Sequence, residues 1–201
     1  MALNTWQSIL PDIIFVGGVK RSGKDFACDR LVEEAGFHKV HIVEPWLRKW
    51  CAEHDYDPDT WETVKFKERA RIQADAAKSR ESNPNVLIDW FREAAPTLPK
   101  PFAVTAVRFI NEAMLGFELG ALVLRVHTPD DIREERFRAA GDDLALMSDP
   151  FEKEVYQMPV HAEIPGIMPA DWYVPAMASI YEVLLDQQLR ARVAQLQGVN
   201  R

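Results

Sequence analysis

The sequence predicts an α/β fold in which a mostly parallel sheet of about five strands lies between two layers of helices. Three observations favour this class. Short apolar runs alternate with helical patterns along most of the 201 residues. The first apolar run leads into a glycine-rich loop that opens a helix. Hydrophobic residues make up 47% of the chain and charged residues 27%, a balance typical of globular proteins.

A glycine-rich loop follows the first predicted strand, the apolar run 13–16. From Gly18 the chain reads G-x-x-x-x-G-K and then has Asp25 where Ser or Thr usually stands. Glycines let the backbone close around a phosphate, a new helix adds its positive dipole end, and Lys24 supplies a mobile charge. The pattern predicts a phosphate-binding loop, with an ordinary strand-to-helix turn as the alternative. Its expected contact residues are Gly18, Lys20, Arg21, Ser22, Gly23, Lys24, Asp25 and Phe26.

A helix and a second strand come next. Residues 25–35 have helical spacing, and Gly36 follows where a left-handed residue ends many helices. Residues 38–43 predict the second strand, with His41 as an ordinary strand residue. The expected buried face of the helix is Phe26, Leu31, Val32 and Ala35.

Residues 45–95 predict a helical insertion between the second and third strands, too long for a simple crossover. Glu44 precedes it, beyond the carboxyl end of a strand, and either meets a substrate or only stabilises the helix dipole. Helices are expected from residue 45, over 58–80 and over 86–95. The segment 58–80 is densely charged, and for most of its charges the expected state is a solvated helix face.

The alternation continues in the second half of the chain. Apolar runs predict strands over 102–107 and 121–126, with a helix to about residue 119 between them. Thr128 and Pro129 then read as a hydroxyl cap and a first-turn proline of another helix.

The last third is less regular. Residues 142–166 suit either a mobile flap or an ordered loop. A short last strand is expected over 171–174, followed by an amphipathic helix over 176–196. The inward residues expected for this helix are Ile180, Val183, Leu184 and Val193.

Composition limits the partners and the compartment. The formal net charge of −7 disfavours a broad nucleic-acid surface but leaves room for a local basic cleft. Cys28 and Cys51 are too few for a disulfide framework, so a reducing cytoplasm is expected, and Cys28 is expected in the core. No signal peptide or membrane segment is recognisable. The length suits a single domain over 1–201, and a homodimer is left open.

Several motifs occur in the same order in the bacteriophage deoxynucleoside monophosphate kinases, within the P-loop nucleoside monophosphate kinases. The loop GVKRSGKD resembles that family in its Gly-Lys-Asp ending, and VRFINEA at 107–113 is similar to its Val-Arg-Phe-Pro-Asn-Glu motif. Weaker matches are HIVEPWLRKW at 41–50, the segment with Gln73 and Arg80, and HAE at 161–163. The resemblance implies a P-loop kinase three-layer sandwich with a lid over about 129–166, in the host cytoplasm if the protein is phage-encoded.

The resemblance also implies a reaction, the transfer of the γ-phosphate of ATP to a (deoxy)nucleoside monophosphate with Mg²⁺. Lys24 would bridge the outer phosphates, and Asp25 would hold the metal in place of the usual hydroxyl. Arg108, just past a strand end, would bind the acceptor phosphate with its planar guanidinium. Arg133 and Arg136 would close over the transferring group from the lid. The residues implied on the substrate side are Glu44, Gln73, Arg80, Arg108 and Glu112.

Two departures from the family pattern keep other functions open. Ala106 stands where the family has Asp, and Ile110 replaces the proline of that motif. The missing Asp leaves three possibilities open: Asp25 compensates for it, the substrate differs, or the activity is lost. The alternatives are a kinase of the same build that acts on a hydroxymethylated base in DNA or another small acceptor, and a non-catalytic nucleotide-binding protein. A DNA acceptor would need a basic channel, which the acidic composition disfavours.

Overall fold

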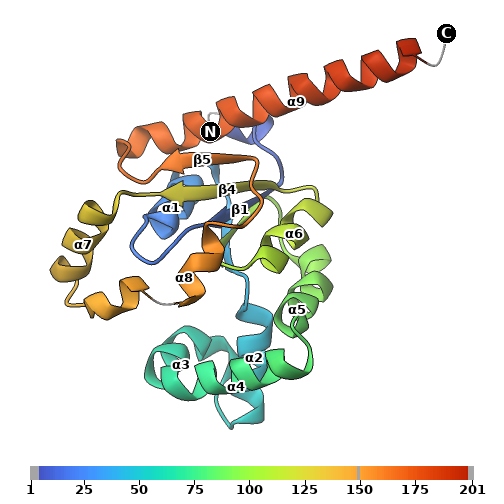
Figure 1. Cartoon of the computed structure of the whole chain (residues 1–201). Helices are drawn as coiled ribbons and strands as arrows, with labels where there is room; N and C mark the ends of the chain where they lie inside the picture. Colours follow the sequence, from blue (N-terminus) through green and yellow to red (C-terminus); the bar gives the residue numbers. More distant parts are fainter. Residues whose placement is uncertain (1–4, 149, 199–201) are drawn as a thin grey trace.

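The computed structural model describes residues 5–148 and 150–198. Five parallel strands form one sheet in the order β2-β3-β1-β4-β5 (Figure 1). Helices cover both faces of this sheet, which confirms the predicted fold class. The strands are β1 (Ile13–Gly17), β2 (His38–His41), β3 (Phe102–Val107), β4 (Leu122–His127) and β5 (Ala162–Pro165).

One or more helices of the described residues follow each strand in the chain. They are α1 (Lys24–Ala35), α2 (Glu44–Glu53), α3 (Trp61–Lys67), α4 (Arg69–Ser82), α5 (Val86–Ala94), α6 (Ile110–Glu118), α7 (Asp130–Ala139), α8 (Pro150–Val155) and α9 (Tyr173–Gly198). Short 3₁₀ turns are η1 (Thr5–Ser8), η2 (Pro58–Thr60), η3 (Ala95–Thr97), η4 (Leu144–Ser148) and η5 (Ala170–Trp172). None of the helices in the described residues combines the length and the apolar character needed to cross a membrane.

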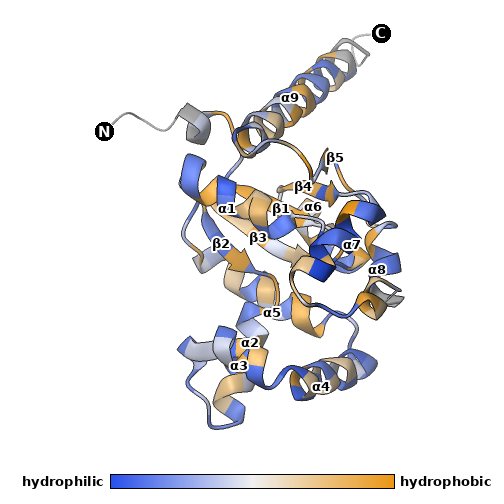
Figure 2. Ribbon diagram, turned by 90° about the vertical axis from the view of Figure 1, so that its left-hand side faces the viewer, coloured by the Kyte–Doolittle hydropathy of each residue, from blue (hydrophilic) through white to orange (hydrophobic). Residues whose placement is uncertain are grey.

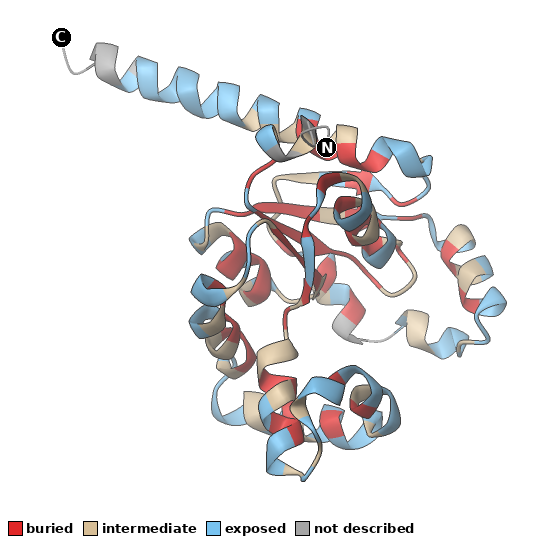
Figure 3. Cartoon of the chain, turned by 180° about the vertical axis from the view of Figure 1, so that it is seen from behind, coloured by how far each residue is buried: buried red, intermediate tan, exposed pale blue. Residues whose placement is uncertain are grey.

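Alternate residues of β1 point to opposite faces of the sheet. Ile14 and Val16 belong to a core that includes α1 and α9, whereas Ile13 and Phe15 belong to a core that includes α5 and α6. Phe15 meets Phe91 of α5 edge to face, with ring centroids 6.0 Å apart. Figure 3 shows the central strands mainly in the colour of buried residues. Burial on both faces explains why the sequence of β1 is a continuous apolar run.

The strand order places a crevice at one end of the sheet. The chain runs from β1 outward to β2, returns to β3 beside β1, and then crosses to β4 on the other side of β1. In open α/β sheets ligands bind beyond the carboxyl ends of the strands at such a reversal of direction. The loop after β1 and the residues after β3 therefore meet at the position where a ligand is expected.

Helices α2 to α5 lie between β2 and β3 in the chain and have a core of their own. Trp46, Trp50 and Trp61 are the largest buried side chains of this core, and the indole N–H of Trp50 donates to Asp75 at 2.9 Å. The helices expected over 45–95 are therefore present, but residues 58–80 form η2, α3 and α4 instead of one continuous helix. The role of these helices on the substrate side stays a prediction.

The predicted last strand is wrong. Residues 171–174 belong to η5 and to the start of α9, and the fifth strand is β5, inside the segment expected to be irregular. Tyr173 and Val174 are buried in the core with α1. Their aromatic and β-branched side chains suit a buried helix turn as well as a strand, so composition alone could not separate the two.

Three details of helix packing also differ from expectation. In α1, Cys28, Leu31 and Ala35 are buried as expected, but Phe26 and Val32 are exposed, and Lys24 and Ala27 are buried as well. In α9, Ile180 and Leu184 pack on the core, whereas Val183 and Val193 are exposed. The second half of α9 extends beyond the body of the protein, which explains the exposure of Val193 (Figure 1). The helix α7 is mainly hydrophilic (Figure 2), and Thr128 does not cap it with its side chain.

Candidate active site

The loop between β1 and α1 has the shape of a phosphate cradle. Gly18 has a φ of +150°, and a Cβ there would lie 2.5 Å from Ser22 Oγ and 2.8 Å from the carbonyl oxygen of Val126. Only glycine fits this position without moving the loop. Ser22 Oγ is buried and has no hydrogen-bond partner within the described part of the chain. Since a buried hydroxyl normally has a partner, the loop fits a phosphate oxygen there.

Lys24 and Asp25 begin α1 directly after the cradle. Lys24 is buried, with Nζ 3.5 Å from the carbonyl oxygen of Val19 and 3.7 Å from Asp25 Oδ2. Burial lowers the pKa of Lys24, although Asp25 opposes this. The hydroxyl of Thr105 on β3 donates to Asp25 Oδ1 at 2.6 Å. Burial alone would raise the pKa of Asp25, but Lys24 and this hydrogen bond outweigh it, so the pKa lies below its ordinary value.

Asp25 is the side chain that would hold Mg²⁺ beside the loop. Among the described residues, no three His, Cys, Asp or Glu side chains gather into a metal site. A single carboxylate nevertheless suits Mg²⁺, because this ion keeps several waters and binds through one or two carboxylates together with substrate phosphates. The donor set is therefore compatible with a metal that arrives with a nucleotide.

The loop is held from behind by residues of the region expected to be a lid. The backbone N–H of Lys20 donates to Glu152 at 2.7 Å, and its carbonyl oxygen accepts from Arg133 at 3.2 Å. The hydroxyl of Thr128 donates to the carbonyl oxygen of Ser22 at 2.7 Å, which is why it is not available as a helix cap. The amide of Lys20 thus faces away from the cradle, and the loop owes its shape to this support.

The end of β5 closes against the same loop. A Cβ at Gly166 would lie 2.0 Å from the carbonyl oxygen of Ser22 and 2.1 Å from Thr128 Oγ1. Arg136 donates to the carbonyl oxygens of Gly166 at 2.8 Å and Arg21 at 3.1 Å. Arg136 lines the cleft, but its guanidinium ties two backbone segments together.

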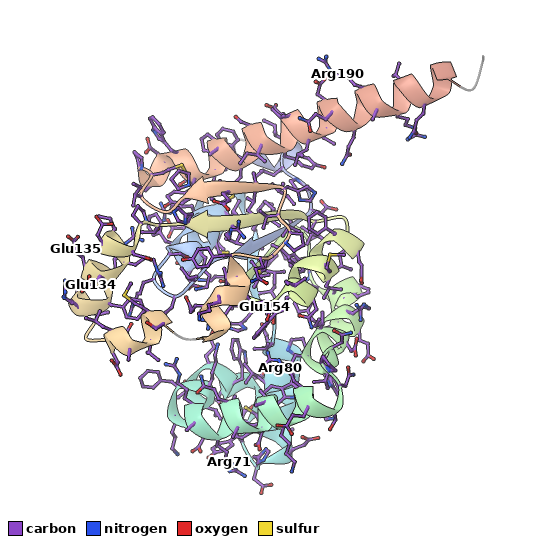
Figure 4. The ribbon with its side chains drawn as sticks, in the orientation of Figure 1. Arg71, Arg80, Glu134, Glu135, Glu154 and Arg190 are labelled. Atoms are coloured by element: carbon purple, nitrogen blue, oxygen red, sulfur yellow. The ribbon has the colours of Figure 1, made fainter. Side chains whose placement is uncertain are left out.

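Arg133 has a different place from the one expected of a catalytic lid residue. Its side chain is buried, pairs with Asp130 at 2.6 Å and Glu152 at 3.4 Å, and does not line the cleft. This position makes Arg133 a support of the loop instead of a group that touches the transferring phosphate. The neighbouring Glu134 and Glu135 lie on the outer side of α7 in Figure 4.

Lys20 and Arg21 both reach a carboxylate of the region expected to be a lid. Asp142 lies 3.1 Å from Lys20 Nζ and accepts from Arg21 Nε at 2.8 Å. Hydrogen bonds from Arg21 and Lys20 hold the pKa of Asp142 below its ordinary value. Two side chains expected to bind phosphates are therefore paired with a carboxylate in this structure.

Arg108 stands directly after β3 and lines the cleft. Its Nε is buried and has no hydrogen-bond partner in the described residues. Glu112 accepts from the backbone N–H groups of Arg108 at 2.7 Å and Phe109 at 3.2 Å. Burial raises the pKa of Glu112 to about 7, although these two bonds oppose the shift. Glu112 thus fixes the backbone that presents Arg108. It also lines the cleft, and the substrate contact expected of it stays a prediction.

The other residues expected on the substrate side fall into two groups. Gln73 and Arg80 of α4 line the cleft. Arg80 lies over the ring of Phe109, 4.6 Å from its centroid, and Figure 4 shows Arg80 on the side of α4 toward the sheet. Glu44 does not line the cleft, because its carboxylate pairs with Arg48 at 2.8 Å one turn further along α2.

Three residues of this cleft have no assigned role in the sequence analysis. His41 at the end of β2, Lys65 of α3 and Arg69 of α4 all line it. Lys65 and Arg69 lie in the charged run that suggests a solvated face. The spacing of Arg69, Gln73 and Arg80 by four and seven residues is the signal that could place them on one face of a helix.

These residues surround a single large cleft with a volume of about 1810 Å³. Sites for one drug-sized ligand have volumes of roughly 300–1,000 Å³, so this cleft has room for two substrates. Cationic side chains outnumber acidic ones along it, although the whole chain has a net charge of −7. The cations are Lys20, Arg21, Lys24, Lys65, Arg69, Arg80, Arg108 and Arg136, and the acids are Asp25, Glu62, Glu81, Glu112 and Glu152.

The fold and the cleft define an α/β protein with a glycine-rich loop between β1 and α1 that lines a large cleft. No protein-family model matches the chain, and no curated protein sequence matches it. Among solved structures, it is similar to a shikimate kinase from Aquifex aeolicus, with 16% identity, a TM-score of 0.46, and coverage of 89% of this chain and 98% of that chain. It is also similar to an unliganded sugar kinase from Janibacter sp. HTCC2649, with 11% identity, a TM-score of 0.49, and coverage of 85% and 94%.

Neither similarity assigns a substrate to this chain, because both identities and both TM-scores are low. Neither of these two structures is a deoxynucleoside monophosphate kinase. The resemblance to that family, drawn from the loop and the VRFINEA motif, stays a hypothesis.

Proposed function

We propose that this protein is an ATP-dependent kinase that transfers a phosphoryl group to a (deoxy)nucleoside monophosphate. The observation that carries the proposal is the presence, in one cleft, of a phosphate-binding loop and a second group of cations. Lys24 belongs to the loop, and Arg108 and Lys65 belong to the second group. Catalysis of phosphoryl transfer consists mainly of positioning and charge neutralisation, for which two neighbouring anion sites are the requirement.

The acids of the cleft favour a phosphate acceptor over a hydroxyl acceptor. A hydroxyl must lose a proton and usually needs a carboxylate base, whereas a phosphate oxygen is already ionised. Asp25 is bonded to Thr105, Glu112 to two backbone N–H groups, and Glu152 to the amide of Lys20. Ala106 occupies the position at which the resemblance leads us to expect a further Asp. Three of the five acids of the cleft therefore already accept hydrogen bonds, and the other two, Glu62 and Glu81, are exposed on α3 and α4.

Each residue then has a defined task. Residues 18–25 would hold the triphosphate of ATP, and Asp25 would hold the accompanying Mg²⁺. ATP with Mg²⁺ supplies the phosphoryl group and part of the charge neutralisation. Arg108 would bind the acceptor phosphate. Arg80, stacked on Phe109, would lie beside the nucleoside.

A panel of acceptors tests the proposal. Purified protein is incubated with ATP and Mg²⁺ and with each common ribo- and deoxynucleoside monophosphate, hydroxymethylated DNA, and small hydroxyl acceptors such as shikimate. We expect a diphosphate from at least one monophosphate and no product from the Lys24→Ala variant. Lys100→Ala is the matched control, since Lys100 is exposed and pairs with Asp12 far from the loop. Transfer only to DNA or to a hydroxyl acceptor, or ATP binding without any transfer, would contradict the proposal.

A further inference from the structure

His41 and Lys65 form a close pair beside Arg108 that the proposed transfer does not by itself explain. Lys65 Nζ lies 2.6 Å from His41 Nε2. In the described part of the chain no ion pair joins Lys65 to a carboxylate, so a neutral ring takes the place that an acid usually has next to a partly buried lysine. The charged groups that face the pair from the surrounding elements are Lys24, Asp25, Glu62, Arg69 and Arg108.

The hydrogen bonds of His41 make the protonation state of Lys65 adjustable. The backbone N–H of Val43 donates to His41 Nδ1 at 3.3 Å, so a neutral ring with this bond carries its hydrogen on Nε2. That hydrogen can be donated to Lys65 only if Lys65 is a neutral amine. If Lys65 is an ammonium, Nε2 must accept and Nδ1 must carry the hydrogen against the N–H of Val43. A neutral Lys65 therefore keeps both contacts of the ring, whereas an ammonium keeps its contact with His41 at the expense of the bond from Val43.

The electrostatic surroundings also favour the neutral form of Lys65. Burial and the nearby Arg108 lower the pKa of Lys65 to about 8, although Asp25 opposes this. Burial and Lys65 lower the pKa of His41 to about 3, so the ring is neutral at physiological pH. Positive groups thus outnumber negative ones around His41 and Lys65, with Lys24, Arg69 and Arg108 against Asp25 and Glu62.

We propose that Lys65 and Arg108 together bind the phosphate of the acceptor, and that this binding is linked to uptake of a proton by Lys65. The inference rests on the proposed function, since it takes the acceptor to be a phosphate monoester. Arg108 Nε is buried without a partner among the described residues, and Lys65 has only a neutral partner. A phosphate dianion would supply both missing interactions and would favour the charged form of Lys65.

Isothermal titration with dAMP, dCMP, dGMP and dTMP tests the linkage. Each titration is done at pH 8 and pH 9 in two buffers of different ionisation enthalpy, where the ligand is already a dianion. For the monophosphate that binds, we expect uptake of about 0.5 proton at pH 8 and about 0.9 at pH 9, and an affinity about fivefold weaker at pH 9, from a pKa of about 8 for Lys65.

Two variants assign the proton. Lys65→Arg keeps the charge at every pH, so it should bind at pH 9 about as well as at pH 8 and without proton uptake. His41→Gln offers an amide oxygen that accepts from an ammonium without a tautomeric conflict, so proton uptake at pH 8 should decrease while binding persists. The matched control is Lys67→Arg on the same helix, because Lys67 is exposed and lies 5.9 Å from the ring of Tyr56, outside the cleft. It should behave as the wild type.

The outcomes separate this inference from the proposed function. Binding of a monophosphate without proton uptake, or uptake that both the Lys65 and the His41 variants retain, overturns the inference and leaves the proposed function intact. Failure of every monophosphate to bind overturns the proposed function. Circular dichroism shows whether each variant is folded, and if Lys65→Arg does not fold, His41→Gln provides the deciding measurement.

Discussion

Replacing Glu112 by glutamine should remove a large pH dependence from the free energy of unfolding. The carboxyl group is buried at the start of α6 and accepts from the N–H groups of Arg108 and Phe109. Burial raises the pKa of Glu112 from 4.5 to about 7. A raised pKa in the folded state means that the unfolded chain gives up this proton at lower pH. The stability that the protonated form contributes is therefore lost as the pH rises from about 4.5 through about 7.

The magnitude follows from these two pKa values. Their difference corresponds to about 3 kcal/mol in total, of which about 2.5 kcal/mol falls between pH 5 and pH 8. Urea unfolding of the wild type and of Glu112→Gln at four pH values across this range measures it. The wild type should lose about 2.5 kcal/mol relative to the variant, whose amide has no charge to desolvate.

The control for this experiment lies on the same helix. Glu118 at the end of α6 is exposed and pairs with Arg92 at 3.0 Å, so Glu118→Gln should show the pH dependence of the wild type. A difference between the wild type and Glu112→Gln that stays constant from pH 5 to pH 8 would refute the argument from burial. It would mean that the two backbone N–H groups stabilise the carboxylate as well as water does.

Three further predictions concern the site. Arg108→Lys should reduce the apparent acceptor affinity or kcat/KM by roughly ten- to a hundredfold, since a charge-assisted bond contributes about 1.5–3 kcal/mol. The affinity for ATP, measured by titration, should be unchanged. Loss of ATP binding would contradict the acceptor assignment. Asp25→Asn should weaken the binding of ATP with Mg²⁺ but not of ATP alone, and adding Ala106→Asp should partly restore the binding of ATP with Mg²⁺. Equal losses with and without Mg²⁺ would leave Asp25 only a stabilising effect on the dipole of α1, of about 0.3–1 kcal/mol. Arg133→Met leaves the buried carboxylate of Glu152 without its cation, whereas the exposed Asp130 stays solvated. It should lower the free energy of unfolding by about 3–5 kcal/mol, unlike the exposed control Arg138→Met; equal unfolding midpoints would show that the buried ion pair is dispensable.

Local patterns were sufficient to predict four of the five strands and the glycine-rich loop between the first strand and the first helix. The run at Ile13–Val16 is buried on both faces, and the glycines at positions 18 and 23 have positive φ, so sequence and structure agree there by a direct physical cause. Gly36 likewise ends α1 in the left-handed conformation. These features depend on residues close together in the chain.

The remaining features depend on partners far away in the chain. The sequence around Arg133 gives no sign that its guanidinium pairs with Glu152 and donates to the carbonyl oxygen of Lys20. His41 and Lys65 are 24 positions apart and come from a strand and a helix, so neither pattern alone could indicate their contact. The strand β5 was missed for the same reason, because its residues become a strand only by pairing with β4.

The tight contact at Gly166 has a consequence for the synthesis of the protein. The carbonyl oxygen of Ser22 accepts from Thr128, 106 positions further along the chain. It also lies so close to Gly166 that a Cβ atom at that residue would collide with it. A peptide that contains only the first strand, the loop and the first helix lacks these contacts with Thr128 and Gly166. On the ribosome, the loop emerges early but reaches its final shape only after the segment around Gly166 has followed it. The nucleotide binding proposed above would therefore be among the last properties that a nascent chain acquires, and it would report that nearly the whole protein has folded.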